Sequence, residues 1–195
     1  MPDRQRLLNL KIKLGASALL MSLALTTLTG CGMTDTNGSD GSDSSAGSDD
    51  LPSAGTSNSE DAADEAERVS SELYDLIGIK GKASDTGPGV SECDDKDPEK
   101  YFTIFHPWTF TPASADQLEG VMERLKTELP KNGWKVVEYG RDNSKNKNLS
   151  LTADNDEKKY SVQIAYFAKD ESPNLNLMLV SGCYQVPDGE KVYRF

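Results

Sequence analysis

Apolar residues recur with helical spacing in two segments of this chain. Over residues 62–77, and again over residues 115–129, they recur every three or four positions, which predicts two amphipathic helices. Ser114 and Gln117 have the spacing of a capping box, so the second helix should begin beside them. We expect that helix to bury one apolar face, made of Leu118, Val121, Met122, Leu125 and Leu129.

Other apolar segments are shorter and predict strands. Aromatic and β-branched residues dominate residues 101–105, which indicates a first strand. Pro107 has no backbone N–H for a ladder, so this strand must end, bulge or lie at a sheet edge near His106. The turn residues over 154–157 should close a hairpin. Beyond the second helix, four segments approach strict alternation and predict successive strands over residues 134–139, 149–153, 160–166 and 175–180.

The expected elements follow one another in the order α-β-α-β-β-β-β. Strands that succeed each other with short connections favour antiparallel pairing. The sequence therefore predicts an α+β fold, in which an antiparallel β-sheet of about four to five strands carries one or two helices on one face. We expect residues 61–195 to form a single domain around one core. The pattern leaves open whether the helix over 62–77 packs on the sheet or presents its apolar stripe to a partner or a membrane.

The N-terminal 30 residues have the three parts of an export signal. Basic residues between Arg4 and Lys13 precede an apolar run over 14–28, which is shorter than the about 20 residues of a confident membrane span. The run ends in Leu28-Thr29-Gly30-Cys31, which resembles the lipobox of bacterial lipoproteins. This resemblance implies a diacylglyceryl group on the Cys31 sulfur and cleavage of the chain before that residue. An ordinary signal peptide that happens to end at a cysteine is the alternative.

The segment after Cys31 is acidic and poor in large apolar residues. The whole chain has a net charge of −11, and removal of residues 1–30, which are basic overall, would make it more acidic. From Gly32 to Glu67 there are ten acids and no lysine or arginine. Such a composition cannot bury enough surface to offset chain entropy, so we expect residues 31–60 to be a flexible linker. The acidity also argues against a nucleic-acid partner.

Cys93 and Cys183 remain once Cys31 is assigned to the lipid. An even pair in an exported chain is the pattern expected of a disulfide, which here would close a loop of 90 residues. Two distant cysteines and the single histidine, His106, are too few ligands for a structural zinc site. We therefore expect no metal site, and the sequence indicates no cofactor.

His106 and Trp108 are the residues most suggestive of a ligand surface. As a catalytic base, His106 would need a nucleophile and an orienting acid, and the sequence identifies neither. A partly buried histidine at a bulge is the simpler interpretation. Trp108 follows Pro107 and should lie near the surface, where its ring could contact an apolar ligand or a sugar. We assign no catalytic residue, because no Gly-x-Ser-x-Gly, Ser-x-x-Lys, His-Glu-x-x-His or phosphate-loop pattern occurs.

Three segments of the expected domain carry a resemblance to a group of bacterial proteins. They are Leu73–Lys82, Phe105–Phe110 and Ser181–Tyr184, and with the acidic linker they resemble small secreted lipoproteins of actinobacteria such as the streptomycetes. The resemblance implies a lipid-anchored location. It implies no activity and no functional residues.

The sequence thus favours a lipoprotein anchored by Cys31 on the extracytoplasmic side of the cell membrane. We expect its domain to be a monomeric, non-enzymatic binding module whose partner is an envelope protein, a lipid or a glycan. The alternative is a small hydrolase that uses Asp or Glu side chains on an envelope glycan, since carboxylates are abundant. A transporter's solute receptor fits less well, because one small domain lacks the two lobes that close around a solute.

Overall fold

The computed structural model describes residues 52–118 and 120–195. The expected signal peptide (residues 1–30), the expected lipidation site Cys31 and the expected linker up to residue 51 lie outside the described residues. The described part contains two α-helices, α1 (Ser59–Ile77) and α2 (Val121–Glu128). Its strands are β1 (Ser53–Thr56), β2 (Gly81–Ala83), β3 (Gly89–Glu92), β4 (Tyr101–Pro112), β5 (Lys135–Arg141), β6 (Leu149–Asn155), β7 (Tyr160–Phe167), β8 (Asn174–Ser181) and β9 (Cys183–Gln185).

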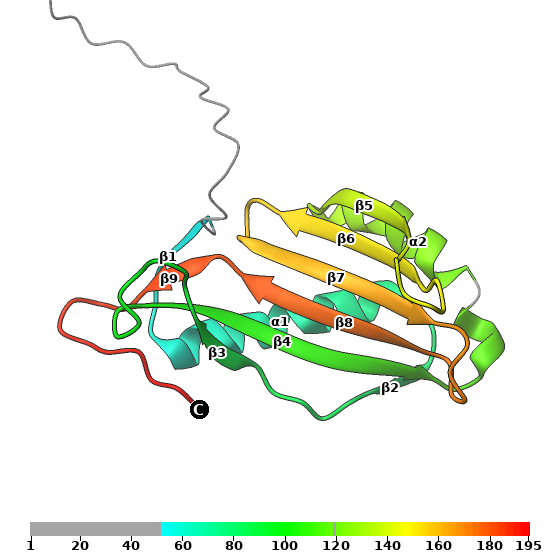
Figure 1. Cartoon of the computed structure of the whole chain (residues 1–195), viewed down its shortest axis with the longest axis horizontal. Coiled ribbons are helices and arrows are strands. Elements are labelled where there is room, and N and C mark those ends of the chain that lie inside the picture. The colour runs from blue at the N-terminus through cyan, green and yellow to red at the C-terminus, as the bar shows by residue number, and fades with distance from the viewer. Residues whose placement is uncertain (1–51, 119) are drawn as a thin grey trace, which may run out of the picture. The chain divides into compact units, whose positions relative to one another are not determined.

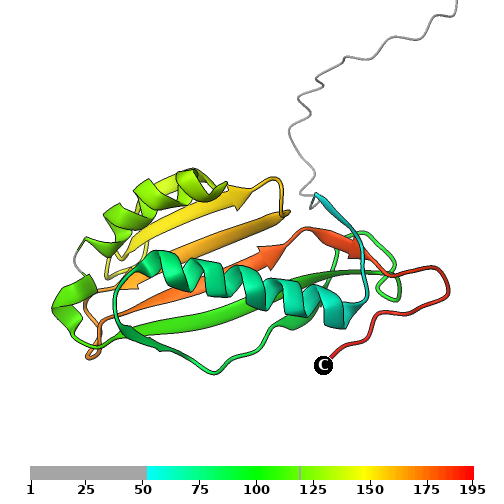
Figure 2. The ribbon, with the colours of Figure 1, turned by 180° about the vertical axis from the view of Figure 1, so that it is seen from behind.

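The nine strands of the described residues form one sheet. Its order is β1-β9-β4-β8-β7-β6-β5, and β2 and β3 each pair with β4. Every pair is antiparallel except β1 with β9, which is parallel. Both helices lie on the same face of the sheet, behind it in Figure 1 and in front of it in Figure 2. They therefore bury one face, and no helix of residues 52–118 and 120–195 covers the other.

The α+β class is confirmed, but the predicted sheet is too small and its order is wrong. The structure has the order β-α-β-β-β-α-β-β-β-β-β, with one parallel pair. The unexpected strands β1, β2, β3 and β9 are only three or four residues long, too short for a period of two to show. Tertiary contacts hold them in place. For example, the Cys183 N–H donates to the Pro52 carbonyl at 2.8 Å and so brings the chain before β1 against β9.

The segment expected to be one helix over 115–129 is divided. It begins as a 3-10 turn, and Gly120, at φ +81°, separates this turn from α2. Glycine adopts such left-handed backbone without strain, so the helix restarts here. No capping box forms, because the Ser114 hydroxyl donates to the Asp116 carboxylate and the Gln117 N–H donates to the Ser114 carbonyl. The expected apolar face is nevertheless buried: Leu118, Val121, Met122, Leu125 and Leu129.

Strand β4 continues through Pro107. This residue stands opposite Met178 of β8. On the other edge of β4, β3 pairs with β4 only as far as Phe105, and the pairing of β2 with β4 begins at Phe110. The nitrogen and carbonyl of one strand residue point to the same edge, and the Pro107 carbonyl accepts the Thr86 hydroxyl at 2.6 Å on the side of β2 and β3. Of the three outcomes predicted for this proline, the structure shows an edge position, in the gap between two short strands.

Helix α1 packs on the sheet, mainly over β4, so its apolar stripe is used within the domain. Asn58 caps the helix by accepting the Asp61 N–H at 2.8 Å, and the helix ends at Gly78 in left-handed conformation. The helix predicted over 62–77 thus begins three residues earlier, at Ser59. The buried stripe consists of Ala62, Ala63, Ala66, Val69, Leu73 and Ile77.

The predicted disulfide between Cys93 and Cys183 is confirmed. The two Cα atoms lie 6.0 Å apart, and both residues are almost completely buried. The bond joins the residue after β3 to the first residue of β9. It therefore fixes two of the short strands that the hydrophobic pattern did not predict.

Candidate functional site

His106 and Trp108 lie on the face of β4 that α1 covers. Alternate residues of a strand share a face, and these two stand between Ile104 and Phe110 of the buried core. His106 is 7 % exposed and Trp108 is 5 % exposed. Trp108 is therefore more deeply buried than its position beside Pro107 suggests. The two side chains meet at a pocket beside α1.

This pocket, called the α1 pocket below, has a volume of about 530 Å³. That volume falls within the range of small-molecule sites. Three parts of the chain line it: the middle of α1, the connection between β2 and β3, and β4. Most of its lining side chains carry hydroxyl, carboxylate or aromatic groups, and none is a lysine or arginine.

A chain of hydrogen bonds holds His106 at the base of the α1 pocket. Its Nε2 lies 2.7 Å from the Thr86 carbonyl, and its Nδ1 lies 2.9 Å from the Ser70 hydroxyl oxygen. A carbonyl can only accept, so Nε2 carries the hydrogen. In the neutral ring, Nδ1 then accepts the Ser70 hydroxyl hydrogen, a tautomer inferred from the two partners. The imidazole is thus fixed in orientation between α1 and the β2–β3 connection.

Trp108 has a polar atom without a partner. Its indole N–H is buried and makes no hydrogen bond to any of the described residues. The ring lies beside that of Tyr74, with centroids 6.4 Å apart, whereas the Tyr74 hydroxyl is satisfied by the Gly81 carbonyl at 3.0 Å. Buried donors are rarely left unpaired, so this N–H is available to donate to an acceptor that is not part of the described residues.

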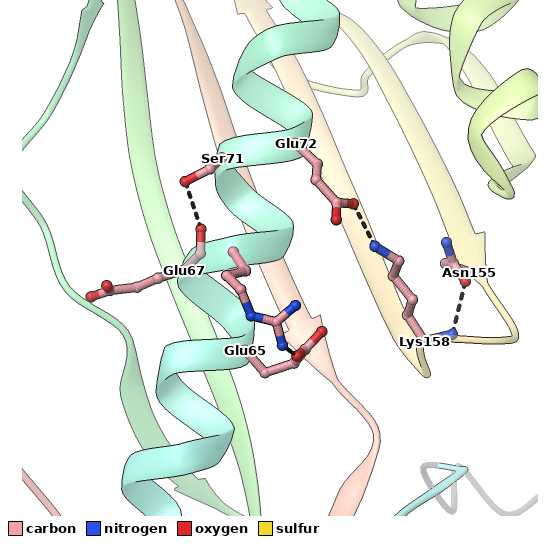
Figure 3. Close-up of polar contacts among 7 residues, drawn as sticks. Glu65, Glu67, Ser71, Glu72, Asn155 and Lys158 are labelled. Atoms are coloured by element: carbon pink, nitrogen blue, oxygen red, sulfur yellow. Dashed lines mark hydrogen bonds and ion pairs between the residues drawn. The ribbon is translucent and has the colours of Figure 1, made fainter.

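The rim of the α1 pocket carries three exposed carboxylates, Glu67, Asp75 and Asp85. None of them forms an ion pair within residues 52–118 and 120–195. The carboxylates on the other flank of α1 are paired: Glu65 with Arg68, and Glu72 with Lys158 at 2.5 Å. Figure 3 shows the Glu67 side chain leaving α1 on the side away from Glu65 and Glu72.

The uncovered face of the sheet carries a second pocket, of about 440 Å³. Gln163 and Met178 of neighbouring strands line it, next to Pro107. Among the described residues that line it, only Trp108, which also lines the α1 pocket, has a buried polar atom without a hydrogen-bond partner. We take the α1 pocket as the candidate site because it also holds His106 and the rim carboxylates, and we use the second pocket as a reference surface.

Sequence reasoning selected His106 and Trp108 and missed Ser70 and Thr86. Ser70 had a signal, because it is a polar residue at a helical position that falls within the buried stripe between Val69 and Leu73. Thr86 contributes its backbone carbonyl, which no side-chain pattern reveals. A catalytic histidine would contact a nucleophile and an acid. The two groups that His106 contacts are the Ser70 hydroxyl and the Thr86 backbone carbonyl, and a carbonyl cannot take the role of the acid.

Comparisons with protein families, curated proteins and solved structures yield no match for this chain. No helix of the described residues is both long and apolar enough to span a bilayer. Within the same residues, no group of three or more His, Cys, Asp or Glu side chains has an arrangement that could hold a metal ion. The properties of the candidate site are therefore argued from its own geometry.

Proposed function

We propose that this protein is a lipid-anchored protein of the extracytoplasmic membrane surface whose domain binds a glycan in the α1 pocket. The observation that carries the glycan assignment is Trp108, whose buried indole N–H has no partner among the described residues and whose side chain lines a pocket of hydroxyls and carboxylates. An unsatisfied buried donor costs about 1–3 kcal/mol, and a ligand oxygen that accepts from it removes this cost.

Sugars match the other groups of the α1 pocket as well. Their C–H faces stack on aromatic rings, and Trp108 and Tyr74 supply two such rings. Their hydroxyls can donate to Glu67, to Asp75 and to the Ser71 oxygen, whose own hydrogen is donated to the Glu67 carbonyl. An anionic ligand, such as a phosphate, would instead meet uncompensated negative charge at the rim.

Binding without catalysis fits this geometry better than hydrolysis. The Cα atoms of Glu67 and Asp75, the two rim carboxylates on α1, are displaced by about 12 Å along the helix axis, since eight residues separate them. A glycoside hydrolase would need to bring two carboxyl groups to roughly 5–10 Å from each other. Ser70, only 6 % exposed within a helix, serves to orient His106, whose other nitrogen bonds a carbonyl instead of an acid.

The anchor half of the proposal is supported by the Leu28-Thr29-Gly30-Cys31 segment and the acidic stretch after it. Intact-mass analysis of the protein from membrane fractions tests it. We expect the mass of a processed, lipid-modified chain, and we expect Cys31→Ala to lose the lipid mass and to stay unprocessed. A Cys31→Ala chain that remained processed and membrane-bound would contradict the anchor.

The binding half is tested by calorimetric titration of the full chain in detergent with soluble envelope-glycan fragments. Trp108→Phe keeps an aromatic ring but removes the N–H, so we expect affinity to fall by roughly five- to 150-fold, which corresponds to about 1–3 kcal/mol. Trp134→Phe is the matched control, because it changes the only other tryptophan, which is also buried but lies outside the pocket. Met178→Ala probes the uncovered sheet face. Equal losses in all three variants, or no binding of any glycan, would refute the assignment.

A further inference from the structure

The sheet face opposite the two helices has an uncharged centre. This centre is formed by β4, β8 and β7, which are neighbours in the sheet (Figure 1). Cross-strand pairing places Pro107, Met178 and Gln163 in one row and Thr109, Asn176 and Ala165 in the next. We call these two rows the neutral face. None of their residues is charged, although 27 % of the residues of the whole chain are.

Charged residues begin at the border of the neutral face. The row of Met178 continues through Thr152 of β6 and ends at Glu138 of the edge strand β5. The adjacent row ends with Asp154 and Lys135. Protein–protein interfaces have the same composition, since charged residues are depleted at their centre, methionine is enriched there, and the rim is polar. The uncovered face thus has the composition of an interface.

Met178 is exposed at the middle of the neutral face, beside a recess. Its side chain is 39 % exposed, although β8 is an inner strand of the sheet. The recess is the second pocket, which Met178 borders together with Pro107 and Ala165. Methionine is flexible and polarisable, so it fills irregular recesses well. The same face therefore carries an exposed apolar side chain and a recess that fits one.

A two-fold contact between identical chains requires both of these parts on one surface. In such a contact the same patch of each copy faces the other, so each side chain is matched by its equivalent. A two-fold axis beside Met178 would bring the methionine of each copy to the second pocket of the other. Two twisted sheets that pack face to face in this way form the layers of a β-sandwich.

The charge of the chain also favours a second copy as the partner. The net charge is −11, so two copies repel each other wherever their acidic surfaces meet. The flank of α1 carries Glu67 and Asp75, which form no ion pair within the described residues. A basic partner would be attracted to that flank. The neutral face instead lets two acidic chains meet without opposed carboxylates.

The size of the surface indicates how strong such a contact can be. β7 and β8 are eight residues long, or about 27 Å, and with β4 and β6 they make a sheet about 19 Å wide. The flat footprint is therefore roughly 500 Å² per copy, or about 1,000 Å² in total, near the lower limit of specific interfaces. We expect a reversible dimer with a Kd in the micromolar range.

We propose that this chain forms a two-fold symmetric dimer through the neutral face, with Met178 of each copy seated in the second pocket of the other. This state differs from the monomer expected from the sequence. It does not depend on the glycan assignment, because α1 and the pocket beside it lie on the other face of the sheet (Figure 2). Each copy in the dimer keeps its own α1 pocket open to a ligand.

Light scattering after size-exclusion chromatography tests the dimer on the full chain in detergent, with the mass of the micelle subtracted. We expect the protein mass to rise from one chain to two as the concentration passes through the micromolar range. Added salt should strengthen the dimer, because it screens the repulsion between two acidic copies. A dimer that weakened with salt would be held by ion pairs, which the neutral face does not contain, and would overturn the proposal.

Three variants locate the contact. Met178→Asp places one charge on each side of the two-fold axis, so we expect the Kd to rise roughly 30-fold or more. Gln163→Glu keeps the size of an exposed side chain and should weaken the dimer less, with recovery at high salt. Tyr193→Asp is the matched control, because Tyr193 is also an exposed large side chain but lies beside Ser59 at the start of α1. It should leave the dimer unchanged.

Two further results would overturn the proposal. One is the mass of a single chain at every concentration up to the millimolar range. The other is an association that Met178→Asp and Tyr193→Asp affect equally, as expected of two chains that merely share a micelle. Circular dichroism and the melting temperature of each variant check that the domain is folded.

Discussion

The Cys93–Cys183 disulfide is the perturbation whose effect can be calculated most directly. It joins residues that are 90 positions apart, so it removes a large amount of chain entropy from the unfolded state. In the loop-entropy treatment, a loop of this length corresponds to about 4–5 kcal/mol. Small domains are stable by only about 5–15 kcal/mol in total. Loss of the bond should therefore leave the domain folded but close to its limit.

We propose to measure this with a Cys93→Ala and Cys183→Ala double variant, because alanines avoid a free thiol and a buried hydroxyl. Urea unfolding followed by tryptophan fluorescence should show an unfolding free energy about 4–5 kcal/mol lower than that of the oxidised chain. The melting temperature should fall by roughly 10–20 °C. The m value should rise, because the unfolded chain without the cross-link exposes more surface.

Thiol reduction of the unmutated chain is the control and should give a similar loss of stability. A loss below about 1 kcal/mol with an unchanged m value would refute the entropic reasoning. Such a result would mean that residual structure already restricts the unfolded chain as much as the disulfide does.

Two further changes test the packing of β1 and the chemistry of a tyrosine. A Cβ at Gly182 would lie 2.3 Å from the Pro52 carbonyl oxygen, so Gly182→Ala should displace β1, lower stability by about 1–3 kcal/mol and expose β1 to protease, whereas Gly140→Ala, with open space around it, should do neither. Burial, followed by the Glu123 carboxylate that accepts its hydroxyl, raises the pKa of Tyr139 to about 12. Because this folded-state pKa exceeds the ordinary value of 10.0, the stabilisation by the protonated phenol is complete below pH 10 and is lost as the pH rises toward 12. Tyr139→Phe should flatten that part of the profile of unfolding free energy against pH, and an unchanged slope would contradict the assignment.

The hydrophobic pattern predicted the long elements because their burial repeats many times. α1 and the strands from β6 to β8 each bury side chains at a constant period, and these elements, like β5, lie within a few residues of their predicted positions. The short strands gave no such repeat. β2 and β9 are held by their neighbours in the sheet, so their positions depend on residues far away in the chain.

At two positions the local sequence did not decide the structure. Ser114 and Gln117 matched a capping box, but Gly120 allows a left-handed turn that starts the helix later. Pro107 left open whether the strand ends, bulges or lies at an edge, and β4 passes through it at an edge position because β2 and β3 leave a gap there. Both outcomes were decided by the arrangement of other elements, which the local sequence does not contain.

Only part of the candidate site could be predicted from the sequence, because the other part depends on elements that are distant along the chain. His106 and Trp108 stood out by residue type, but their partners come from α1 and from the β2–β3 connection. Ser70 contacts His106 across 36 positions of sequence. A search for polar residues within an otherwise apolar helical stripe would have found Ser70, whereas the Thr86 carbonyl becomes apparent only once the fold is known.

Under the proposed anchor at Cys31, the parallel pairing of β1 with β9 has a mechanical consequence. Any pull on the tether enters the domain at Pro52, whose carbonyl is bound by the Cys183 N–H. Cys183 is covalently joined to Cys93, so the load passes from a few hydrogen bonds into a cross-linked part of the sheet. The Ser57 N–H, bonded to the Gln185 carbonyl at 3.0 Å, makes a second attachment before α1. Force would have to detach β1 before it reached α1, the helix that forms one wall of the α1 pocket.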